Sequence, residues 1–355
     1  MASWKQILRN SITSYEQLRA AFPGLIEPAV AEVIKRYPLR INSYYLELIK
    51  HHGQPLFRQA VPSPAELACG PCEIDPLAED RLSPVPGIVH KYPDRVLFLV
   101  ANQCALYCRF CTRKRHVGRP SMPDGRTHLD RGLDYLRRHP EIKEVLVSGG
   151  DPLLLEDHLL EDLLRALRSI DTLEIIRIGS RVPCTLPMRI TTRLCRILKR
   201  YHPLFINTHF NHPAELTEEA KQACTRLADA GIPLGSQTVL LRGVNDSPET
   251  IRTLMQGLLR FRVKPYYLFQ TDITAGTDHF RTTTAEGLAI MEQLLGHISG
   301  MAVPAYALDA PGGRGKIRLS PNYVLATGSS LSFRSYQGDL CSYPEPDTLP
   351  PAFSQ

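Results

Sequence analysis

The chain has 355 residues and a net charge of +6, and no run of about 18 apolar residues that would span a membrane. Basic residues are scattered except for a dense spot at 113–116, which disfavours nucleic acid as the main ligand. Nine cysteines without a paired pattern indicate a reducing compartment, and the first residues lack the apolar core of a secretory signal. We therefore expect a cytoplasmic protein.

Residues 1–90 are predicted to form a helical extension followed by a connector. Thr13 and Glu16 have the spacing of a capping box, before an amphipathic stretch that reaches Phe22. Further helices are expected at 27–35 and 42–51, and the connector at 60–87 is rich in proline and glycine.

Residues 91–300 show a regular alternation of apolar, β-branched runs with amphipathic stretches. The runs are 96–101, 144–148, 174–179, 204–209, 236–241 and 265–270. The amphipathic stretches are 159–167, 192–199, 218–230, 249–261 and 285–298. After the first gap the runs recur roughly every 30 residues, the length of a βα unit. This pattern predicts an α/β fold, a partial (β/α)6 barrel with its chemistry at the carboxyl ends of the strands. An open doubly wound sheet is the alternative.

The C-terminal segment, 301–355, begins with an apolar run at 301–308. A glycine-rich loop follows this run, and the tail after Tyr343 is rich in proline.

Cys104, Cys108 and Cys111 follow the first strand with the spacing Cys-x3-Cys-x2-Cys. Three thiolates from one loop can hold three irons of a [4Fe–4S] cluster and leave the fourth iron open to a small molecule. With Phe110 before the last cysteine, this spacing resembles the signature of the radical S-adenosylmethionine (SAM) enzymes. A partial zinc site or chance clustering is the alternative, although no fourth ligand stands in register.

Two glycine-rich segments carry further candidates. Gly149, Gly150 and Asp151 follow the second strand; they form either an ordinary turn or a segment resembling the Gly-Gly-Glu that holds the methionine part of SAM. Lys316 follows the glycine-rich loop, which lacks P-loop spacing because Ala310 stands where glycine is required. Such a lysine can form a Schiff base with an aldehyde cofactor, or can simply be solvated.

Several ordered motifs together resemble the lysine 2,3-aminomutase family. They are residues 83–95, 104–115, 148–152, 207–213, 239–246, 265–272 and 309–316. The resemblance covers residues 50 to 340. Members are radical SAM enzymes that also use pyridoxal 5′-phosphate (PLP) and exchange the α-amino group of an amino acid with a β-hydrogen.

The resemblance implies a role for each matching residue. The three cysteines would bind the cluster, to which SAM adds through its amino and carboxylate groups, and Lys316 would hold PLP as an aldimine. Arg95 and Lys91 are candidates for the PLP phosphate, with a strand-edge charge as the alternative. Arg113 would pair with the substrate α-carboxylate, or be a solvated member of the basic run. His209 and Gln237 would line the SAM and PLP pocket, or serve as buried structural residues.

The resemblance implies that Asp272 and Asp309 determine which substrate binds. Matching aspartates grip the terminal ammonium of lysine in the lysine-specific members, and two carboxylates are mutually stabilised around one cation. The resemblance therefore implies an L-lysine 2,3-aminomutase, which moves the amino group by a 5′-deoxyadenosyl radical mechanism to give β-lysine. Arginine or a protein-borne lysine of a translation elongation factor remains an alternative substrate, and a non-catalytic iron–sulfur protein an alternative function. The reaction also implies an electron donor such as a flavodoxin or ferredoxin, and it allows a homo-oligomer.

The sequence departs from the family in a few places. Only Cys341 stands in the C-terminal region, so the structural zinc site of some members is not expected. Arg314 replaces a glycine of the loop before the candidate PLP lysine. Cys69 and Cys72 form an extra Cys-x2-Cys, either incidental thiols or a redox or metal pair. Cys184, Cys195 and Cys224 are expected to be buried.

Overall fold

The computed structural model describes residues 3–68, 70, 72–119 and 126–346. Its main feature is a nine-stranded sheet in which the strands follow one another in chain order. The strands are β1 (Ile88–Tyr92), β2 (Arg95–Ala101), β3 (Glu144–Gly149), β4 (Ile175–Gly179), β5 (Leu204–Thr208), β6 (Leu234–Leu240), β7 (Lys264–Gln270), β8 (Ala305–Ala310) and β9 (Gly315–Arg318). Strands β2 to β8 run parallel, and β1 and β9 pair antiparallel at the two edges.

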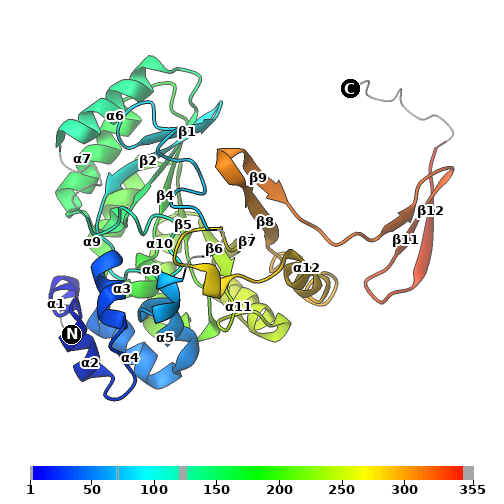
Figure 1. Cartoon of the computed structure of the whole chain (residues 1–355). Coiled ribbons are helices and arrows are strands. Elements are labelled where there is room, and N and C mark those ends of the chain that lie inside the picture. The colour runs from blue at the N-terminus through cyan, green and yellow to red at the C-terminus, as the bar shows by residue number, and fades with distance from the viewer. Residues whose placement is uncertain (1–2, 69, 71, 120–125, 347–355) are drawn as a thin grey trace.

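The sheet curves into a nearly closed barrel, so that its edge strands β1 and β9 approach each other (Figure 1). The Tyr92 hydroxyl on β1 accepts a hydrogen bond from the backbone N–H of Lys316 on β9 at 3.0 Å. The predicted barrel is confirmed, and the six predicted runs correspond to β2 to β7. The doubly wound alternative is wrong, because such a sheet reverses its strand order.

Helices cover the outer face of the barrel, and an N-terminal group packs at one end (Figure 1). They are α1 (Trp4–Arg9), α2 (Tyr15–Ala21), α3 (Val30–Arg36), α4 (Ser43–His52), α5 (Gln54–Ala60), α6 (Arg126–Arg138), α7 (Asp157–Arg168), α8 (Val182–Thr185), α9 (Thr192–Leu198), α10 (Glu218–Asp229), α11 (Pro248–Arg260) and α12 (Thr284–Glu292). The predicted capping box at Thr13 is wrong by one residue: Ser14 caps α2 and Gln17 closes the box. The helix predicted at 285–298 ends earlier, at Glu292.

The inner face of the barrel is lined by partly exposed side chains. Buried and partly exposed residues alternate along β3, β4 and β6. The buried set, for example Val145, Ile176 and Leu234, belongs to the main core together with residues of the covering helices such as Leu160. Because successive side chains of a strand point to opposite faces, the partly exposed set faces inward. An interior lined by partly exposed side chains leaves room for ligands.

The N-terminal helices lie against the carboxyl end of the barrel. The Asn42 side chain, at the start of α4, donates hydrogen bonds to the carbonyls of Ala105 and Thr185, each at 2.9 Å. Tyr45 on the same helix donates to Glu215 at 2.7 Å. The extension is thus bound to the cysteine-containing loop after β2, not loosely attached.

Beyond β9 the chain forms a small separate antiparallel sheet that projects from the barrel (Figure 1). Its strands are β10 (Val324–Ala326), β11 (Ser330–Arg334) and β12 (Leu340–Pro344). The proline-rich tail predicted after Tyr343 lies mostly outside the described residues. Among the helices the structure describes, none is long and apolar enough to cross a membrane.

Candidate active site

The three cysteines lie together in the loop that follows β2. Cys104, Cys108 and Cys111 are all free and partly buried. Burial raises the pKa of the Cys104 and Cys111 thiols, and the neighbouring thiols act in the same direction. In the described part of the chain no three His, Cys, Asp or Glu side chains converge closely enough for a single metal ion. A four-iron cluster takes one thiolate at each iron that the protein holds, and three cysteines on one loop supply that donor set.

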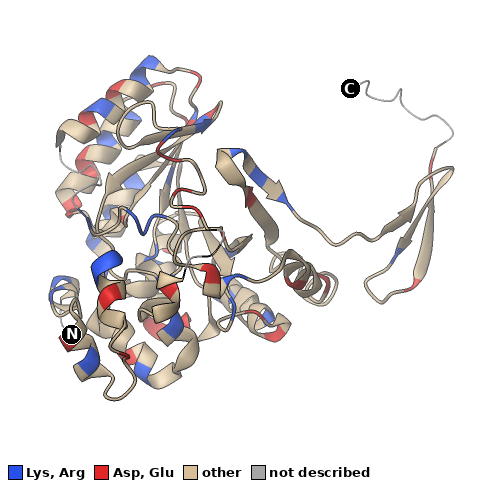
Figure 2. Cartoon of the chain, viewed as in Figure 1, with Lys and Arg blue, Asp and Glu red and all other residues tan. Residues whose placement is uncertain are grey.

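Buried ion pairs hold the cysteine loop in place. Arg109 forms a bidentate ion pair with Glu66, in which Nε and Nη2 donate to the two carboxylate oxygens at 2.9 and 2.6 Å. The Lys114 ammonium donates to the same carboxylate at 2.8 Å, and burial lowers the pKa of Lys114 to about 8. All three side chains are almost inaccessible to solvent. The basic spot at 113–116 is therefore not a free cationic patch, in keeping with the interspersed charges of Figure 2.

The Gly-Gly-Asp segment at the end of β3 packs directly on this loop. A Cβ atom at Gly149 would lie 2.2 Å from the Ala101 carbonyl oxygen, and one at Gly150 would lie 2.4 Å from that of Gln103. Gly149 also has a φ of 130°. Both positions therefore require glycine for close backbone approach.

The Asp151 carboxylate accepts hydrogen bonds from protein donors. It accepts hydrogen bonds from the Ser180 hydroxyl at 2.7 Å and from the backbone N–H groups of Leu153, Arg181 and Val182. Burial, opposed by these bonds, raises the pKa of Asp151 to about 6. The sequence assigned this residue to SAM, whereas its carboxylate in the structure fixes the segment that follows β4.

Arg181 lies in this region, although the sequence did not predict it as a site residue. Its guanidinium donates to the Cys108 sulfur, to Gln59 and to Glu215, each at 2.7 Å. It also lies 5.2 Å from the centre of the Phe110 ring. Its position directly after a barrel strand was the available signal.

The His209 and Phe110 rings are tilted against each other, with 5.6 Å between the ring centres. Its Nε2 is 2.9 Å from the Asn211 side-chain oxygen. Burial and the nearby Arg181 charge lower the pKa of His209 to about 3, so the imidazole is neutral at physiological pH. Gln237 lies on β6, partly exposed and on its inward face.

The interior also contains an unpaired polar atom. The Asn207 side-chain nitrogen on β5 is buried and has no hydrogen-bond partner among the described residues. Buried donors in proteins are nearly always paired, so a bound group is the natural acceptor. This atom and the partly exposed inner face fit the accommodation of cofactors inside the barrel.

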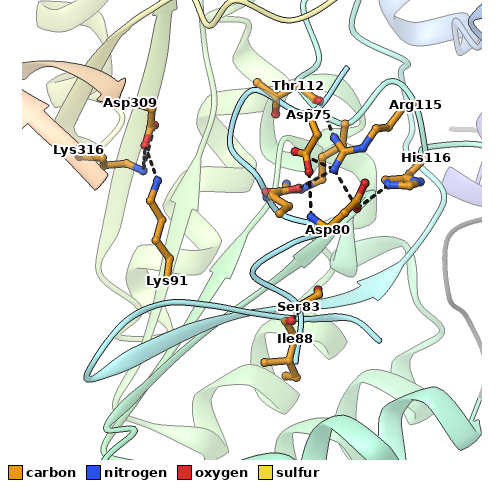
Figure 3. Close-up of polar contacts among 12 residues, drawn as sticks. Asp75, Asp80, Ser83, Ile88, Lys91, Thr112, Arg115, His116, Asp309 and Lys316 are labelled. Carbon is orange, nitrogen blue, oxygen red and sulfur yellow. Dashed lines mark hydrogen bonds and ion pairs between the residues drawn. The ribbon is translucent and has the colours of Figure 1, made fainter. Parts of the chain in front are cut away.

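Lys316 lies on the hairpin formed by β8 and β9, directly opposite Asp309 in the strand register. Its ammonium is 3.1 Å from the Asp309 carboxylate and 5.3 Å from the centre of the Phe269 ring. Lys91 on β1 reaches the same carboxylate at 3.4 Å (Figure 3). Asp309 is largely buried, at 8% side-chain exposure, whereas Lys316 is 35% exposed and accessible to a cofactor.

Asp272 and Asp309 line one cavity of about 350 Å³ at the ends of β7 and β8. Burial, followed by the charge of Asp309, raises the pKa of Asp272 to about 7, although Lys316 and Lys91 oppose the shift. The two carboxylates therefore form an acidic site whose ionisation an added cation would favour.

Two predicted anion-binding residues have protein partners of their own. Arg113 is paired with Glu79 at 2.6 Å. Arg95 lies at the amino end of β2, 2.8 Å from Asp94 and stacked 4.2 Å from the centre of the Tyr92 ring. Arg95 thus lies at the opposite end of β2 from the cysteine loop, although Tyr92 connects it to the lysine hairpin.

Comparison with known proteins identifies the family. A model described as Radical SAM superfamily matches residues 98–255, and one described as Lysine-2,3-aminomutase matches residues 291–354. The L-lysine 2,3-aminomutase of Methanococcus maripaludis is 48% identical over 352 residues, covering 97% of this chain and 81% of that protein. The chain belongs to the lysine 2,3-aminomutase family. The L-lysine 2,3-aminomutase of Clostridium subterminale is 46% identical, covering 98% of this chain and 85% of that protein.

Family membership makes the chain a radical SAM aminomutase, an intramolecular transferase that uses a [4Fe–4S] cluster, SAM and PLP. The family also includes a different substrate class. The glutamate 2,3-aminomutase of Clostridioides difficile is 43% identical over 314 residues, covering 88% of this chain and 74% of that protein. A solved radical SAM methyltransferase from Sphaerobacter thermophilus shares 16% identity over 64% of this chain and 72% of that one, with a TM-score of 0.46.

Proposed function

We propose that this aminomutase interconverts L-lysine and β-lysine. The observation that carries the proposal is the pair Asp272 and Asp309 in one cavity, beside the Lys316 ammonium. A substrate attached near Lys316 would extend its side chain into this acidic cavity. A terminal ammonium would be attracted there and would favour the ionised form of both carboxylates.

The same pair disfavours glutamate as the substrate. A third carboxylate brought into a cavity with two aspartates would be repelled, and burial would strengthen the repulsion. Sequence identity alone does not decide, because the glutamate enzyme resembles this chain almost as closely as the lysine enzymes do. The two aspartates are what favour lysine in this cavity, which Arg281 also lines. Arginine, which is also cationic, is the competing free substrate.

Different candidate residues would bind the cluster, PLP and the substrate. Cys104, Cys108 and Cys111 would hold the cluster, and Lys316 would hold PLP, since it is the accessible lysine beside the cavity. When bound, the cluster and SAM supply the radical that starts the reaction, and PLP carries the migrating amino group. Arg113 would hold the substrate α-carboxylate, because a guanidinium matches a carboxylate geometrically.

Other residues would shape the pocket. His209 and Gln237 would line the SAM and PLP space, with His209 neutral and therefore adding no charge. Lys91, which reaches into the same region, would neutralise the PLP phosphate with Arg95. Gly149 and Gly150 would bring the end of β3 close to SAM and the cysteine loop, and Asp151 would keep that segment rigid.

The proposal includes a one-electron donor of the flavodoxin or ferredoxin type, because the cluster must be reduced before the first cleavage of SAM. It also places the reaction in the cytoplasm, where a reducing environment protects the cluster. We assign residues 1–90 to the N-terminal extension, 91–300 to the barrel core and 301–355 to the segment that carries the PLP lysine.

An anaerobic assay tests the proposal. The reconstituted protein is incubated with SAM, PLP, a strong reductant and L-lysine, with arginine and glutamate in parallel, and products are identified by mass spectrometry. We expect β-lysine without net consumption of SAM. Conversion of arginine or glutamate in preference to lysine would refute the proposed substrate. Asp272→Asn should lower the rate with lysine, and Asp246→Asn, whose carboxylate caps an exposed turn, serves as the control.

A further inference from the structure

An acidic segment outside the barrel contacts the residue assigned to the substrate carboxylate. This segment, residues 73–82, is an acidic strap that carries Glu79. The Glu79 carboxylate contacts Nε of Arg113 at 2.8 and 3.1 Å and Nη2 at 2.6 Å. Glu79 is only 8% exposed at its side chain and Arg113 only 19%, so the pair is well shielded from water.

Glu79 occupies only one edge of the guanidinium. A guanidinium can bind one carboxylate through Nε and Nη2 and another through the edge that includes Nη1. Within the described ranges Nη1 of Arg113 has no protein partner, since every hydrogen bond of this side chain goes to Glu79 through Nε or Nη2. The contact therefore orients Arg113 while leaving an edge free for a second carboxylate.

The acidic strap is itself fixed to the three loops of the site. Its backbone pairs with the loop after Asp272, where the Glu73 N–H donates to the Ile273 carbonyl at 2.7 Å. On the lysine-hairpin side, the Gly312 N–H donates to the Pro76 carbonyl at 3.1 Å. On the cysteine-loop side, Arg115 pairs with the strap carboxylates Asp75, at 3.0 Å, and Asp80, at 3.2 Å (Figure 3).

The residue before Glu79 supports a positioning role. Ala78 has a φ of 51°, in the left-handed region that non-glycine residues rarely adopt. Such strain persists only when surrounding contacts hold it, and it is common next to functional groups. The strap thus keeps an unfavourable backbone conformation at the point where it directs Glu79 toward Arg113.

We propose that Glu79 is a positioning residue, which orients Arg113 so that its free edge receives the α-carboxylate of the amino acid substrate. The inference rests on the proposed function, in which Arg113 binds that carboxylate. Glu79 touches neither substrate nor cofactor in this scheme and acts through Arg113. Its removal should therefore weaken recognition of the carboxylate end selectively and leave recognition of the side-chain end intact.

The test compares two ligands that differ only at the carboxylate. Dissociation constants of L-lysine and of L-lysinamide, which has a neutral amide in its place, are measured by calorimetry on the PLP-loaded protein, along with KM and kcat for lysine. For Glu79→Gln we expect the lysine dissociation constant and KM to rise about tenfold, because a misoriented Arg113 would lose one charge-assisted hydrogen bond to the α-carboxylate. The lysinamide constant should change less than about twofold. Asp246→Asn, whose carboxylate caps an exposed turn outside the strap, is the control and should affect neither ligand.

Equal weakening of both ligands by Glu79→Gln would overturn the inference, because a merely structural strap residue would act that way. If Glu79→Gln does not fold, Glu79→Asp replaces it, and the same selective loss of lysine binding is required. Arg113→Lys separates this inference from the proposed function. If Arg113→Lys leaves lysine binding unchanged, the assignment of Arg113 fails. If Arg113→Lys weakens lysine binding and Glu79→Gln does not, the role of Glu79 alone is refuted.

Discussion

The raised pKa of Asp272 predicts how the stability of the cofactor-free protein depends on pH. Asp272 carries a pKa raised to about 7, chiefly by burial and then by the neighbouring Asp309. In the unfolded chain an aspartate has a pKa of about 3.9. Between about pH 4 and about pH 7 the folded protein therefore keeps a proton that the unfolded chain has released, and stability falls as pH rises. The difference in pKa corresponds to a loss of order 4 kcal/mol at most, complete above the folded pKa.

Asp272→Asn removes this titrating group and so should remove its contribution to the fall, whereas Asp151, whose pKa is also raised, keeps its own. Urea unfolding of the cofactor-free protein, at about pH 4 and at about pH 8, measures the free energy of unfolding of both proteins. We expect the variant to gain stability relative to the wild type at the higher pH, by a few kcal/mol at most. Added L-lysine should stabilise the wild type more than the variant at the higher pH, since its ammonium pairs with the ionised carboxylate.

A carboxylate with the opposite behaviour provides the control. Burial acts to raise the pKa of Asp80, but Arg115 and His116 outweigh it and hold that pKa below its usual range. Asp80→Asn should therefore remove a stabilising contribution that is present at neutral pH and lost as pH falls. If Asp272→Asn shows the same loss of stability between the two pH values as the wild type, the electrostatic description of the cavity is refuted.

Three further variants test other parts of the site. Lys316→Ala should abolish the borohydride-trapped PLP adduct while Lys91→Ala retains it, and an adduct persisting in Lys316→Ala would move the cofactor to another lysine. Glu66→Gln leaves two buried cations without their shared carboxylate, and should cost about 3–5 kcal/mol in urea unfolding and lower the iron content. The double change of Cys69 and Cys72 to serine should leave iron content and β-lysine formation unchanged, and loss of either would give that pair a function.

The barrel was predictable because helices cover its outer face and its inner face is shielded from bulk water. Strands with both faces shielded carry apolar, β-branched residues in nearly continuous runs, and the runs recur at the length of a βα unit. The edge strands β1 and β9 were not predicted, because short antiparallel hairpins carry no such period. These two strands carry Lys91 and Lys316. The elements that were not predicted are therefore the ones that bring the two lysines to Asp309.

The partners of the charged residues were the least predictable feature. Residues 113–116 form a basic spot in sequence, yet Lys114 is buried against Glu66 and Arg113 against Glu79, which lie 48 and 34 residues away along the chain. Asp151 likewise follows a strand, as a ligand-binding residue should, but its carboxylate is occupied by backbone donors. Pairings of this kind depend on which distant segments fold together, and no local pattern encodes them. Motif matching selected the candidate residues, and only the structure could show which of their charges are already paired.

The paired charges also explain how a site built on loops can stay rigid. The cysteine loop, the loop after Asp272 and the lysine hairpin belong to different strands, and a barrel interior lined by partly exposed side chains does little to hold their ends together. The acidic strap contacts all three from outside the barrel, and it supplies backbone partners to two of them. Holding three loops in one arrangement is costly in conformational entropy. A segment that connects the three loops through its own contacts reduces the number of arrangements they can adopt. Precise placement of the substrate between a radical source and PLP requires such restriction, and the connector between the N-terminal helices and the barrel provides it.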